Sequence, residues 1–487
     1  MKVSISEIRS ALAERGLLAG EEGKLPDEVT GIADDSRKVN RGDLFIAVRG
    51  WNSDGHDFLD AAAQRGAAVA VVEDPNRAKV PALVVREGRR AAAVAASVAH
   101  GHPARALTIL GVTGTNGKTT TTTIIRHLFD EGSSSSASIG TLGVLVGSAG
   151  EILPGGGGLT TPGPVELQRI LRALLDRGVR TVAMEVSSHS LDQRRVDGLE
   201  FDVAIFTNLT RDHLDYHGTM EAYLHAKARL LEYVKPDGTA VLNADAPEWG
   251  TLRTKSRPLT FAIRAAADIR AESVRYTPRG SEWHLVTPRG SGEVTLPLIG
   301  DVNVENALAA AAAAFALGHG PQQIAKNLGA VPQVSGRLEI ISVRPTVLRD
   351  YAHTPDALER TLRTAREFTR GKLIVVFGCG GERDKGKRPI MGEIAERGAD
   401  CAIVTSDNPR TEDPDAIIDD IEVGMRATGH ERVTDRLAAI QRALDLAEDG
   451  DIVLLAGKGH ETYQIRGTTS YPFDEKEIVR EMTGSHA

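Results

Sequence analysis

The sequence predicts an α/β fold built from three domains. Its 487 residues exceed what one hydrophobic core usually serves, because a domain typically holds about 100–200 residues. Short runs rich in Val, Ile and Leu recur along the chain, separated by helix-length segments. This is the pattern of parallel strands joined by right-handed helical crossovers. We place the domains at residues 1–103, 104–333 and 334–487.

The first domain is predicted to be a small α/β unit. The runs LFIAV (44–48) and AVAVVE (68–73) have the composition of strands, and the alanine-rich segments 59–65 and 91–99 have that of helices. The tripeptide Gly-His-Pro at 101–103 interrupts the pattern, so we expect the unit to end there.

The other two domains repeat a strand–helix alternation. In the central one, TILGVT, TVAMEV and VAIFTN alternate with helical patterns after residues 118, 165 and 219, which predicts a mostly parallel sheet. The C-terminal domain is predicted to be a second doubly wound unit. Its strands are TVLRD (346–350), KLIVVFG (372–378), CAIVTS (401–406) and DIVLLAG (451–457).

Composition and charge exclude several classes of protein. The chain carries 58 Lys and Arg against 66 Asp and Glu, a net charge of −8, which disfavours nucleic-acid binding. Two cysteines fit a reducing, cytoplasmic compartment. The N-terminus lacks the apolar core of a secretory signal, and the longest apolar run, 307–317, is shorter than the roughly 20 residues of a membrane span. We expect no membrane association.

A glycine-rich segment after the first central strand predicts a polyphosphate site. GVTGTNGKTT (111–120) departs from the strict Walker pattern, because Val112 stands where a glycine is expected and the extra glycine is Gly114. A turn leading into a helix still offers free backbone N–H groups and the helix dipole to an anion. A plain turn with a surface lysine is the alternative. The residues expected to bind are Gly114, Thr115, Asn116, Gly117, Lys118, Thr119 and Thr120.

The nucleotide and its metal ions are predicted from further residues of this domain. GTPases read guanine with Asn-Lys-x-Asp, and no Asn-Lys pair occurs here, so we expect ATP. Glu185 and His213 follow two other strands, whose carboxyl ends meet at the same edge, so with Thr119 they are candidate ligands of divalent ions. A single histidine is more often structural. By its spacing alone, Lys227 is a solvated helix lysine.

Several motifs taken together resemble the Mur ligase family over nearly the whole chain. They are GTNGKTT, MEVSSHSL, NLTRDHLDYHG, AKARL, VNVENALAA, SGRLE and DYAHTPDAL, in the family's order. The resemblance implies an N-terminal UDP-sugar domain, a central ATPase domain and a C-terminal Rossmann-like domain. It also implies that ATP phosphorylates a substrate carboxylate and that an amino acid's amine then attacks the acyl phosphate to form an amide.

The resemblance assigns further nucleotide and metal ligands. Lys118, Glu185, His213 and Lys227 would form the catalytic group, with two Mg²⁺ ions held by Thr119, Glu185, His213 and a carbamate formed on Lys227 from CO₂. The residues implied to contact ATP from other segments are Asn306, Arg337, Asp350 and His353. Because the last three belong to the C-terminal domain or its linker, domain closure would complete the site.

Three loops of the C-terminal domain are predicted to select the incoming amino acid. GCGGERDKGKR, SDNPRTEDP and GKGHETYQ each follow a strand, so they should gather at the carboxyl edge of the sheet. Alone, Asp-Asn-Pro reads as a turn. Arg383 and Arg410 suit a carboxylate and Glu461 an ammonium, as in the second head of diaminopimelate. The residues assigned to this amino acid are Arg383, Asp407, Asn408, Pro409, Arg410, Gly457 and Glu461.

The acceptor follows from the resemblance, which implies UDP-N-acetylmuramoyl-L-Ala-D-Glu. Its expected contacts are Ser36, Trp51, Asn52, Ser53, Thr160, Thr161, Ser187, Gln193 and Arg195. Thr160 and Thr161 are equally well explained as caps of the helix that begins at Pro164. The alternatives are a lysine-adding relative, a folylpolyglutamate synthetase-like ligase and, from another class, a P-loop regulatory ATPase. We expect a monomer. The stereoisomer of diaminopimelate and the base that deprotonates its amine stay open.

Overall fold

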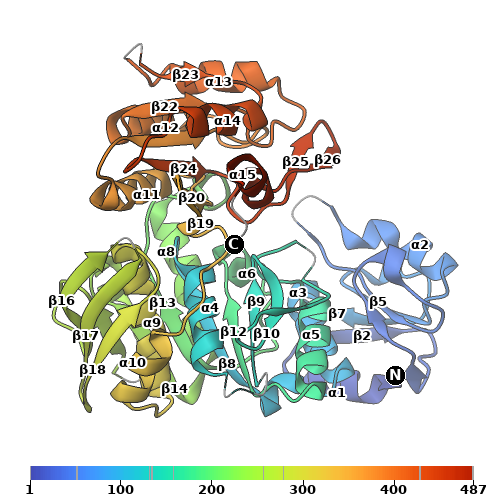
Figure 1. Ribbon diagram of the computed structural model, residues 1–487. Helices are drawn as coiled ribbons and strands as arrows, with labels where there is room; N and C mark the ends of the chain where they lie inside the picture. The colour runs from blue at the N-terminus through green and yellow to red at the C-terminus, as the bar shows by residue number, and fades with distance from the viewer. Residues whose placement is uncertain are drawn as a thin grey trace.

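The computed structural model describes residues 2–50, 53–130, 132, 135–156, 158–255, 257–277, 279–426 and 429–484. Its three main sheets, of five, eleven and six strands, follow one another along the chain. Figure 1 shows the corresponding lobes, with the C-terminal lobe in orange and red above the central lobe and the N-terminal lobe in blue beside it. The predicted α/β class is therefore confirmed. The exact domain limits stay predictions.

The N-terminal sheet has the order β2-β7-β6-β5-β4, parallel except for the pair β2–β7. Helix α3 is buried along almost its whole length, because its alanines allow close contact with α1 on one side and with α5 of the central lobe on another. The elements are β1 (Val3–Ser4), α1 (Ile5–Glu14), β2 (Leu18–Glu22), β3 (Glu28–Val29), β4 (Ile32–Ala33), β5 (Leu44–Ile46), α2 (Leu59–Gln64), β6 (Val69–Val72), β7 (Ala82–Val85) and α3 (Gly88–Ala99).

The central sheet runs β11-β10-β9-β12-β8-β13-β14-β15-β16-β17-β18 and is parallel from β9 to β16, with antiparallel strands at both edges. Its strands are β8 (Thr108–Thr113), β9 (Ser136–Gly140), β10 (Gly143–Val146), β11 (Glu151–Leu153), β12 (Thr181–Glu185), β13 (Phe201–Phe206), β14 (Val234–Asn243), β15 (Leu259–Ala262), β16 (Ile269–Thr277), β17 (Gly280–Thr287) and β18 (Gly290–Leu296). Its helices are α4 (Lys118–Leu128), α5 (Pro164–Asp176), α6 (Ser188–Asp192), α7 (Leu214–His217), α8 (Met220–Ala228), α9 (Asp301–Ala316) and α10 (Pro321–Leu328).

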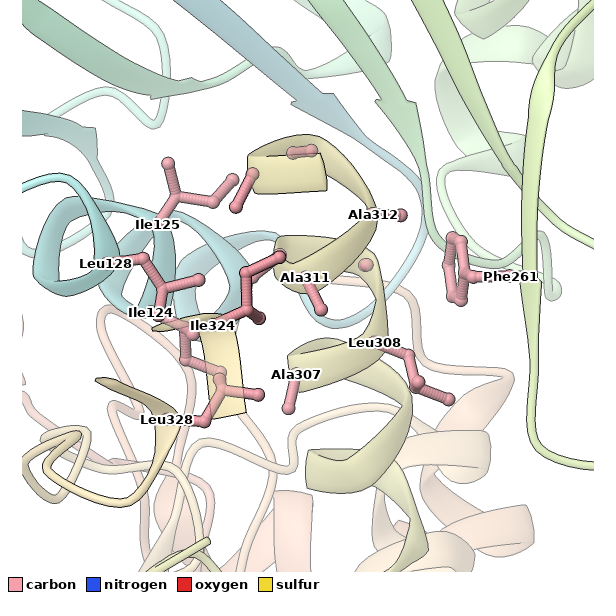
Figure 2. Packing of buried hydrophobic residues seen from close by; sticks show 14 of the residues in the cluster. Ile124, Ile125, Leu128, Phe261, Ala307, Leu308, Ala311, Ala312, Ile324 and Leu328 are labelled. Carbon is pink, nitrogen blue, oxygen red and sulfur yellow. The ribbon is translucent and has the colours of Figure 1, made fainter. Parts of the chain in front are cut away.

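The phosphate-loop helix α4 is held in place by the alanine-rich helix α9. Figure 2 shows Ile124 and Leu128 of α4 beside Ile324 and Leu328 of α10, next to the alanines of α9. Small side chains let the helix axes approach closely, and the alanine run is buried among these elements. This packing fixes the start of α4 at the carboxyl edge of the sheet.

Among the described residues, no helix is long and apolar enough to cross a bilayer.

The C-terminal sheet has the order β19-β20-β24-β21-β22-β23 and is parallel except for β19, which confirms the predicted doubly wound unit. Its elements are β19 (Glu339–Val343), β20 (Thr346–Asp350), α11 (Pro355–Phe368), β21 (Leu373–Phe377), α12 (Lys387–Gly398), β22 (Cys401–Val404), α13 (Pro414–Glu422), β23 (Glu431–Arg432), α14 (Arg436–Leu446), β24 (Ile452–Ala456), β25 (Tyr463–Arg466), β26 (Thr469–Pro472) and α15 (Glu475–Thr483).

Helix α11 joins the C-terminal lobe to the central one. At its first turn, Asp356 Oδ2 accepts hydrogen bonds from Asn116 Nδ2 at 2.9 Å and from Thr210 Oγ1 at 3.1 Å. About one and two turns further on, ion pairs connect it to α9: Arg360 to Glu305 and Arg363 to Asp301, each at 3.3 Å. These contacts bring the carboxyl edges of the two large sheets together.

Candidate active site

The phosphate loop has the geometry that its glycines predict. Gly114 and Gly117 have φ angles of +146° and +86°, which other residues rarely adopt. A Cβ at Gly117 would lie 2.3 Å from Asn306 Oδ1, so α9 approaches the loop too closely for any side chain there. The turn thus leads directly into the N-terminus of α4, where an anion is favoured.

Lys118 lacks an anionic hydrogen-bond partner among the described residues. Its Nζ donates to the carbonyl oxygens of Gly114 and Thr115, at 2.9 and 2.7 Å. Burial lowers the pKa of this ammonium, because charge is costly away from water. A bound polyphosphate would supply the missing counter-charge, so the loop fits the nucleotide that its sequence predicts.

Oxygen donors suited to Mg²⁺ lie beside the loop. Glu185 ends β12, its side chain is buried, and its carboxylate accepts hydrogen bonds from Thr141 N at 2.8 Å and Thr141 Oγ1 at 3.2 Å. The Thr119 hydroxyl accepts a hydrogen bond at 3.2 Å from Nη2 of Arg337, a residue of the linker to the C-terminal domain. Carboxylate and hydroxyl oxygens are the hard ligands that Mg²⁺ prefers.

His213 caps the start of α7 in a left-handed conformation, with φ of +52°. Its ring packs edge-on against His189, with ring centroids 4.7 Å apart. The His189 ring also lies 4.3 Å from that of Tyr216, and burial lowers the pKa of His189 to about 4. Aromatic contacts therefore fix the orientation of His213 near the carboxyl edge of the sheet.

Lys227 is not the solvated lysine that its spacing alone suggested. Its side chain is only 1% exposed, and Nζ donates to Gly114 O at 2.7 Å while lying 4.4 Å from the centroid of the Tyr223 ring. Burial, with the nearby charge of Lys118, lowers the pKa of Lys227 well below its ordinary value. The amine therefore lies at the phosphate loop in surroundings that disfavour its charged form.

A cavity of about 330 Å³ is lined by Lys118, Thr119, Glu185 and His213, whereas Lys227 is not on its wall. Nearly all of the predicted ATP-binding residues line it, and so do Glu185, His213 and Thr160; Gly114 does not. Asp350, at the end of β20, accepts a hydrogen bond from Leu338 N at 2.7 Å, and its burial raises the pKa of the carboxyl group. The predicted ATP residues on the wall are Thr115, Asn116, Gly117, Lys118, Thr119, Thr120, Asn306, Arg337, Asp350 and His353.

A second cavity, of about 820 Å³, opens at the carboxyl edge of the C-terminal sheet. Its wall includes six residues assigned from sequence to the amino acid: Arg383, Asp407, Asn408, Arg410, Gly457 and Glu461. Pro409 is buried and does not line it. The two cavities share Asp212, His213, Tyr351, His353 and Thr354, so they meet at the junction of the lobes.

The Asp-Asn-Pro-Arg segment is more than the simple turn considered as its alternative. Asn408 Oδ1 accepts a hydrogen bond from Ile465 N at 2.9 Å, and Arg410 Nη1 donates to Gly381 O at 2.7 Å. Arg410 itself has a φ of +54°, a rare conformation for a residue with a side chain. Asp407 Oδ2 is buried without a hydrogen-bond partner among the described residues. All three binding loops meet here.

Several residues assigned to the acceptor form a cluster next to Glu185. The Thr161 hydroxyl donates to Glu185 O at 2.8 Å, and the Thr161 carbonyl accepts from Arg195 Nη1 at 2.9 Å. Gln193 Oε1 accepts from Arg195 Nε at 3.1 Å. The hydroxyl oxygens of Ser187 and Thr161 lie 3.4 Å apart. Gly163 occupies the N-cap of α5, so neither threonine caps that helix.

The other residues assigned to the acceptor belong to the N-terminal part of the chain. Ser36 begins a short 3-10 helix and Ser53 lies after β5, both in the N-terminal lobe and outside the two cavities. Trp51 and Asn52 lie outside the described residues. Hydrogen bonds therefore group Thr160, Thr161, Ser187, Gln193 and Arg195 around Glu185 and Thr141, and none among the described residues links Ser36 or Ser53 to them.

Comparisons with known proteins agree with this geometry. Three sequence profiles match the chain: "Mur ligase family, catalytic domain" at residues 28–110, "Mur ligase middle domain" at 112–314 and "Mur ligase, glutamate ligase domain" at 336–459. A UDP-N-acetylmuramoyl-L-alanyl-D-glutamate–2,6-diaminopimelate ligase of Geobacillus kaustophilus is 45% identical, over 94% of this chain and 95% of its own. The chain belongs to the Mur ligase family. The corresponding ligase of Geobacter metallireducens is also 45% identical, over 94% of both chains.

Solved structures of Mur ligases share the fold. One, titled as a UDP-N-acetylmuramoyl-L-alanyl-D-glutamate–2,6-diaminopimelate ligase, is 34% identical, covers both chains completely and has a TM-score of 0.70. MurF from Acinetobacter baumannii is similar at 21% identity and a TM-score of 0.68, covering 100% of this chain and 99% of that one. At that identity the likeness shows the fold alone.

The structure of this Mur ligase adds residues that sequence reasoning did not single out. Asn303 lines the nucleotide cavity and its Oδ1 accepts from Asn306 Nδ2 at 3.4 Å. Its position three residues before Asn306, on the same helical face, was the available signal. Asp356 lies within the quoted motif DYAHTPDAL, but no pattern in the sequence indicated that it reaches the phosphate loop from another lobe. The described residues contain no group of three or more His, Cys, Asp or Glu side chains placed to hold a metal.

Proposed function

We propose that this Mur ligase uses ATP to join diaminopimelate to the D-Glu carboxyl group of UDP-N-acetylmuramoyl-L-Ala-D-Glu, a step of peptidoglycan precursor synthesis. The supporting observation is the pair of cavities that share a wall at His213 and His353, one lined by the phosphate loop and the other by Arg383, Arg410 and Glu461. The near-full-length likeness to ligases of that name supports the choice of substrates.

The first chemical step joins two anions. The D-Glu carboxylate oxygen attacks the γ-phosphorus of ATP, the bond to the β-phosphate oxygen breaks, and ADP leaves an acyl phosphate behind. Lys118, whose Nζ lies at the phosphate loop, would offset part of the repulsion between carboxylate and phosphate. Thr119, Glu185 and His213 would hold Mg²⁺, which supplies further positive charge to the phosphates when bound.

The second step forms the amide. The amine of diaminopimelate attacks the acyl carbon, an amine proton is lost, and the tetrahedral intermediate expels phosphate. Arg383 and Arg410 suit the distal carboxylate of the amino acid, and Glu461 suits its distal ammonium. Binding of that head in the C-terminal loops directs the opposite amine toward the junction of the two cavities.

Lys227 completes the proposed metal site as a carbamate. A neutral amine adds to CO₂ and loses a proton, which converts a cation into an anionic oxygen ligand. The burial of Lys227 supports this reaction, because it lowers the pKa of the amine and so favours the neutral form that adds to CO₂. The modified lysine would hold a second Mg²⁺ close to the phosphate loop.

The cellular setting is part of the proposal. Both cysteines are free, Cys379 being buried and Cys401 half-buried, which is compatible with a reducing cytoplasm. We infer that the enzyme acts there, as a monomer, on soluble nucleotide-linked substrates. Light scattering of the purified chain would measure its oligomeric state.

A substrate panel tests the proposal. The enzyme should release phosphate only when both the UDP-muramoyl-dipeptide and diaminopimelate are present, and mass spectrometry should show one added diaminopimelate per nucleotide product. Lysine in place of diaminopimelate separates the two kinds of Mur ligase, and LL- and meso-diaminopimelate assign the stereoisomer. Phosphate release from ATP without either substrate would instead identify a regulatory ATPase.

A further inference from the structure

A lysine that does not line the amino-acid cavity lies directly behind its wall. Lys458, in the loop after β24, has a side chain that is 0% exposed. Its Nζ lies 3.1 Å from Asn408 Oδ1 and 3.2 Å from Glu461 Oε2. The cavity touches Asn408 and Glu461 but not Lys458, so the ammonium acts only through these two residues.

The contacts of Lys458 converge on two oxygen atoms. Glu461 Oε2 accepts from Lys458 and also from Asn408 Nδ2, at 2.8 Å. Asn408 Oδ1 accepts from Lys458 and also from Ile465 N of β25, at 2.9 Å. This network fixes the side chains of Asn408 and Glu461 on two different loops relative to each other.

The same network leaves one carboxylate oxygen of Glu461 available. Within the described part of the chain, Glu461 Oε1 accepts no hydrogen bond, although Oε2 accepts two. The Glu461 side chain is 15% exposed and lines the cavity. A carboxylate held by one oxygen presents the other in a defined direction, which suits a ligand ammonium.

Burying a lysine completely is costly unless its charge is matched. An apolar side chain of similar volume commonly stabilises a core equally well or better than a buried ion pair does. The position of a buried cation at the wall of a binding cavity is therefore better explained by its effect on the geometry of that wall than by a contribution to stability.

We propose that Lys458 is a positioning residue for the amino-acid substrate: it fixes Glu461 and Asn408 so that the free Glu461 oxygen accepts the ammonium of the substrate's distal head. The inference rests on the proposed ligase function and deepens it. In this arrangement one carboxylate is shared by two ammonium groups: Lys458 donates to Glu461 Oε2, and the substrate would donate to Oε1.

The test replaces Lys458 with Met, which has a similar length and no charge. We expect the KM for diaminopimelate to rise by at least about tenfold, the factor that corresponds to 1.4 kcal/mol, while the KM for ATP changes by less than about twofold. The matched control is Lys476→Met, which removes another lysine from a carboxylate, Glu339 at 2.9 Å, in the same lobe but outside the cavity. It should leave both KM values unchanged.

A double-mutant cycle with Glu461→Gln separates positioning from general loss of structure. If Lys458 acts through Glu461, the Lys458→Met change should add little to the KM effect of Glu461→Gln. Full additivity, or an unchanged diaminopimelate KM in Lys458→Met, overturns the inference. Thermal melting of each variant identifies unfolding. If Lys458→Met does not fold, Lys458→Gln keeps a hydrogen-bond donor and should still weaken diaminopimelate binding in a calorimeter.

The outcome is distinct from a failure of the proposed function. A wild-type enzyme that does not use diaminopimelate refutes the ligase assignment. A wild-type enzyme that uses it, beside a Lys458→Met variant with the same diaminopimelate KM, refutes only the role of Lys458.

Discussion

Removing the guanidinium of Arg410 gives the sharpest test of amino-acid recognition. Arg410 lines the larger cavity, and its Nη1 is oriented by Gly381 O at 2.7 Å. Among the described residues the guanidinium has no carboxylate hydrogen-bonded to it. A substrate carboxylate would therefore make a charge-assisted bond that the unliganded protein does not satisfy internally.

The size of the effect follows from that geometry. Losing one partner of an enclosed charge pair costs about 3 kcal/mol, which is roughly a 100-fold drop in kcat/KM for diaminopimelate. Lysine lacks the distal carboxylate, so turnover with lysine, where measurable, should fall little. The preference for diaminopimelate over lysine should therefore shrink by about the same factor, with the KM for ATP unchanged.

The assay compares Arg410→Ala and Arg410→Gly with the wild type by phosphate release. Because Arg410 has a φ of +54°, glycine relieves the backbone conformation while it removes the same guanidinium. Both variants should lose diaminopimelate turnover, although Arg410→Gly should be the more stable. Arg366→Ala is the control, since Arg366 pairs with Asp400 on the surface of the same lobe. Equal losses for both amino acids would refute the reasoning.

Two further predictions concern Lys227 and Glu412. Lys227→Met should lower turnover by about 100- to 1000-fold. ¹³C NMR with labelled bicarbonate should show a carbamate carbon in the wild type and not in the variant. A fully active wild type without that signal excludes the carbamate. Hydrogen bonds from Arg388, the largest influence, lower the pKa of Glu412 from 4.5 to about 2, so this carboxylate stabilises the fold above pH 4.5 and the contribution disappears as the pH falls toward 2. Glu412→Gln should therefore lower the free energy of unfolding by about 1–3 kcal/mol at pH 7. Denaturant titrations should show that this difference from the wild type vanishes by about pH 2. A difference in unfolding free energy that stays constant with pH contradicts the assignment.

The order of strands and helices was predictable because it depends on local patterns. The strands around the phosphate loop and those of the C-terminal sheet appear where apolar β-branched runs place them. The edges of the central sheet were less predictable. The hairpins β9–β10–β11 and β16–β17–β18 add antiparallel strands to a sheet that was predicted to be mostly parallel, and the sequence did not indicate where these strands would lie.

The site was predictable where its residues follow a strand, and less so where a partner comes from elsewhere. Glu185 and His213 lie near the carboxyl edge because parallel strands deliver their ends there. Asp356 also follows a strand, β20, but the sequence could not show its contacts with Asn116 and Thr210, because they join residues from two lobes. Periodicity placed Lys227 on a helix, but it could not show that the helix packs this lysine against the phosphate loop.

By itself, the sequence determined the chemical groups of this protein and the edge at which each would lie: a phosphate loop before one helix and three polar loops after the strands of a second sheet. Only the tertiary structure decided which of these groups are buried away from solvent. Lys227 and Lys458 are both fully enclosed, and their enclosure depends on packing between segments distant in the chain. The free-energy cost of burying a charge depends on all the atoms around it, so a local sequence pattern cannot specify that cost. The lowered pKa of Lys227 and the burial of the Lys458 ammonium therefore arise only when the lobes are folded.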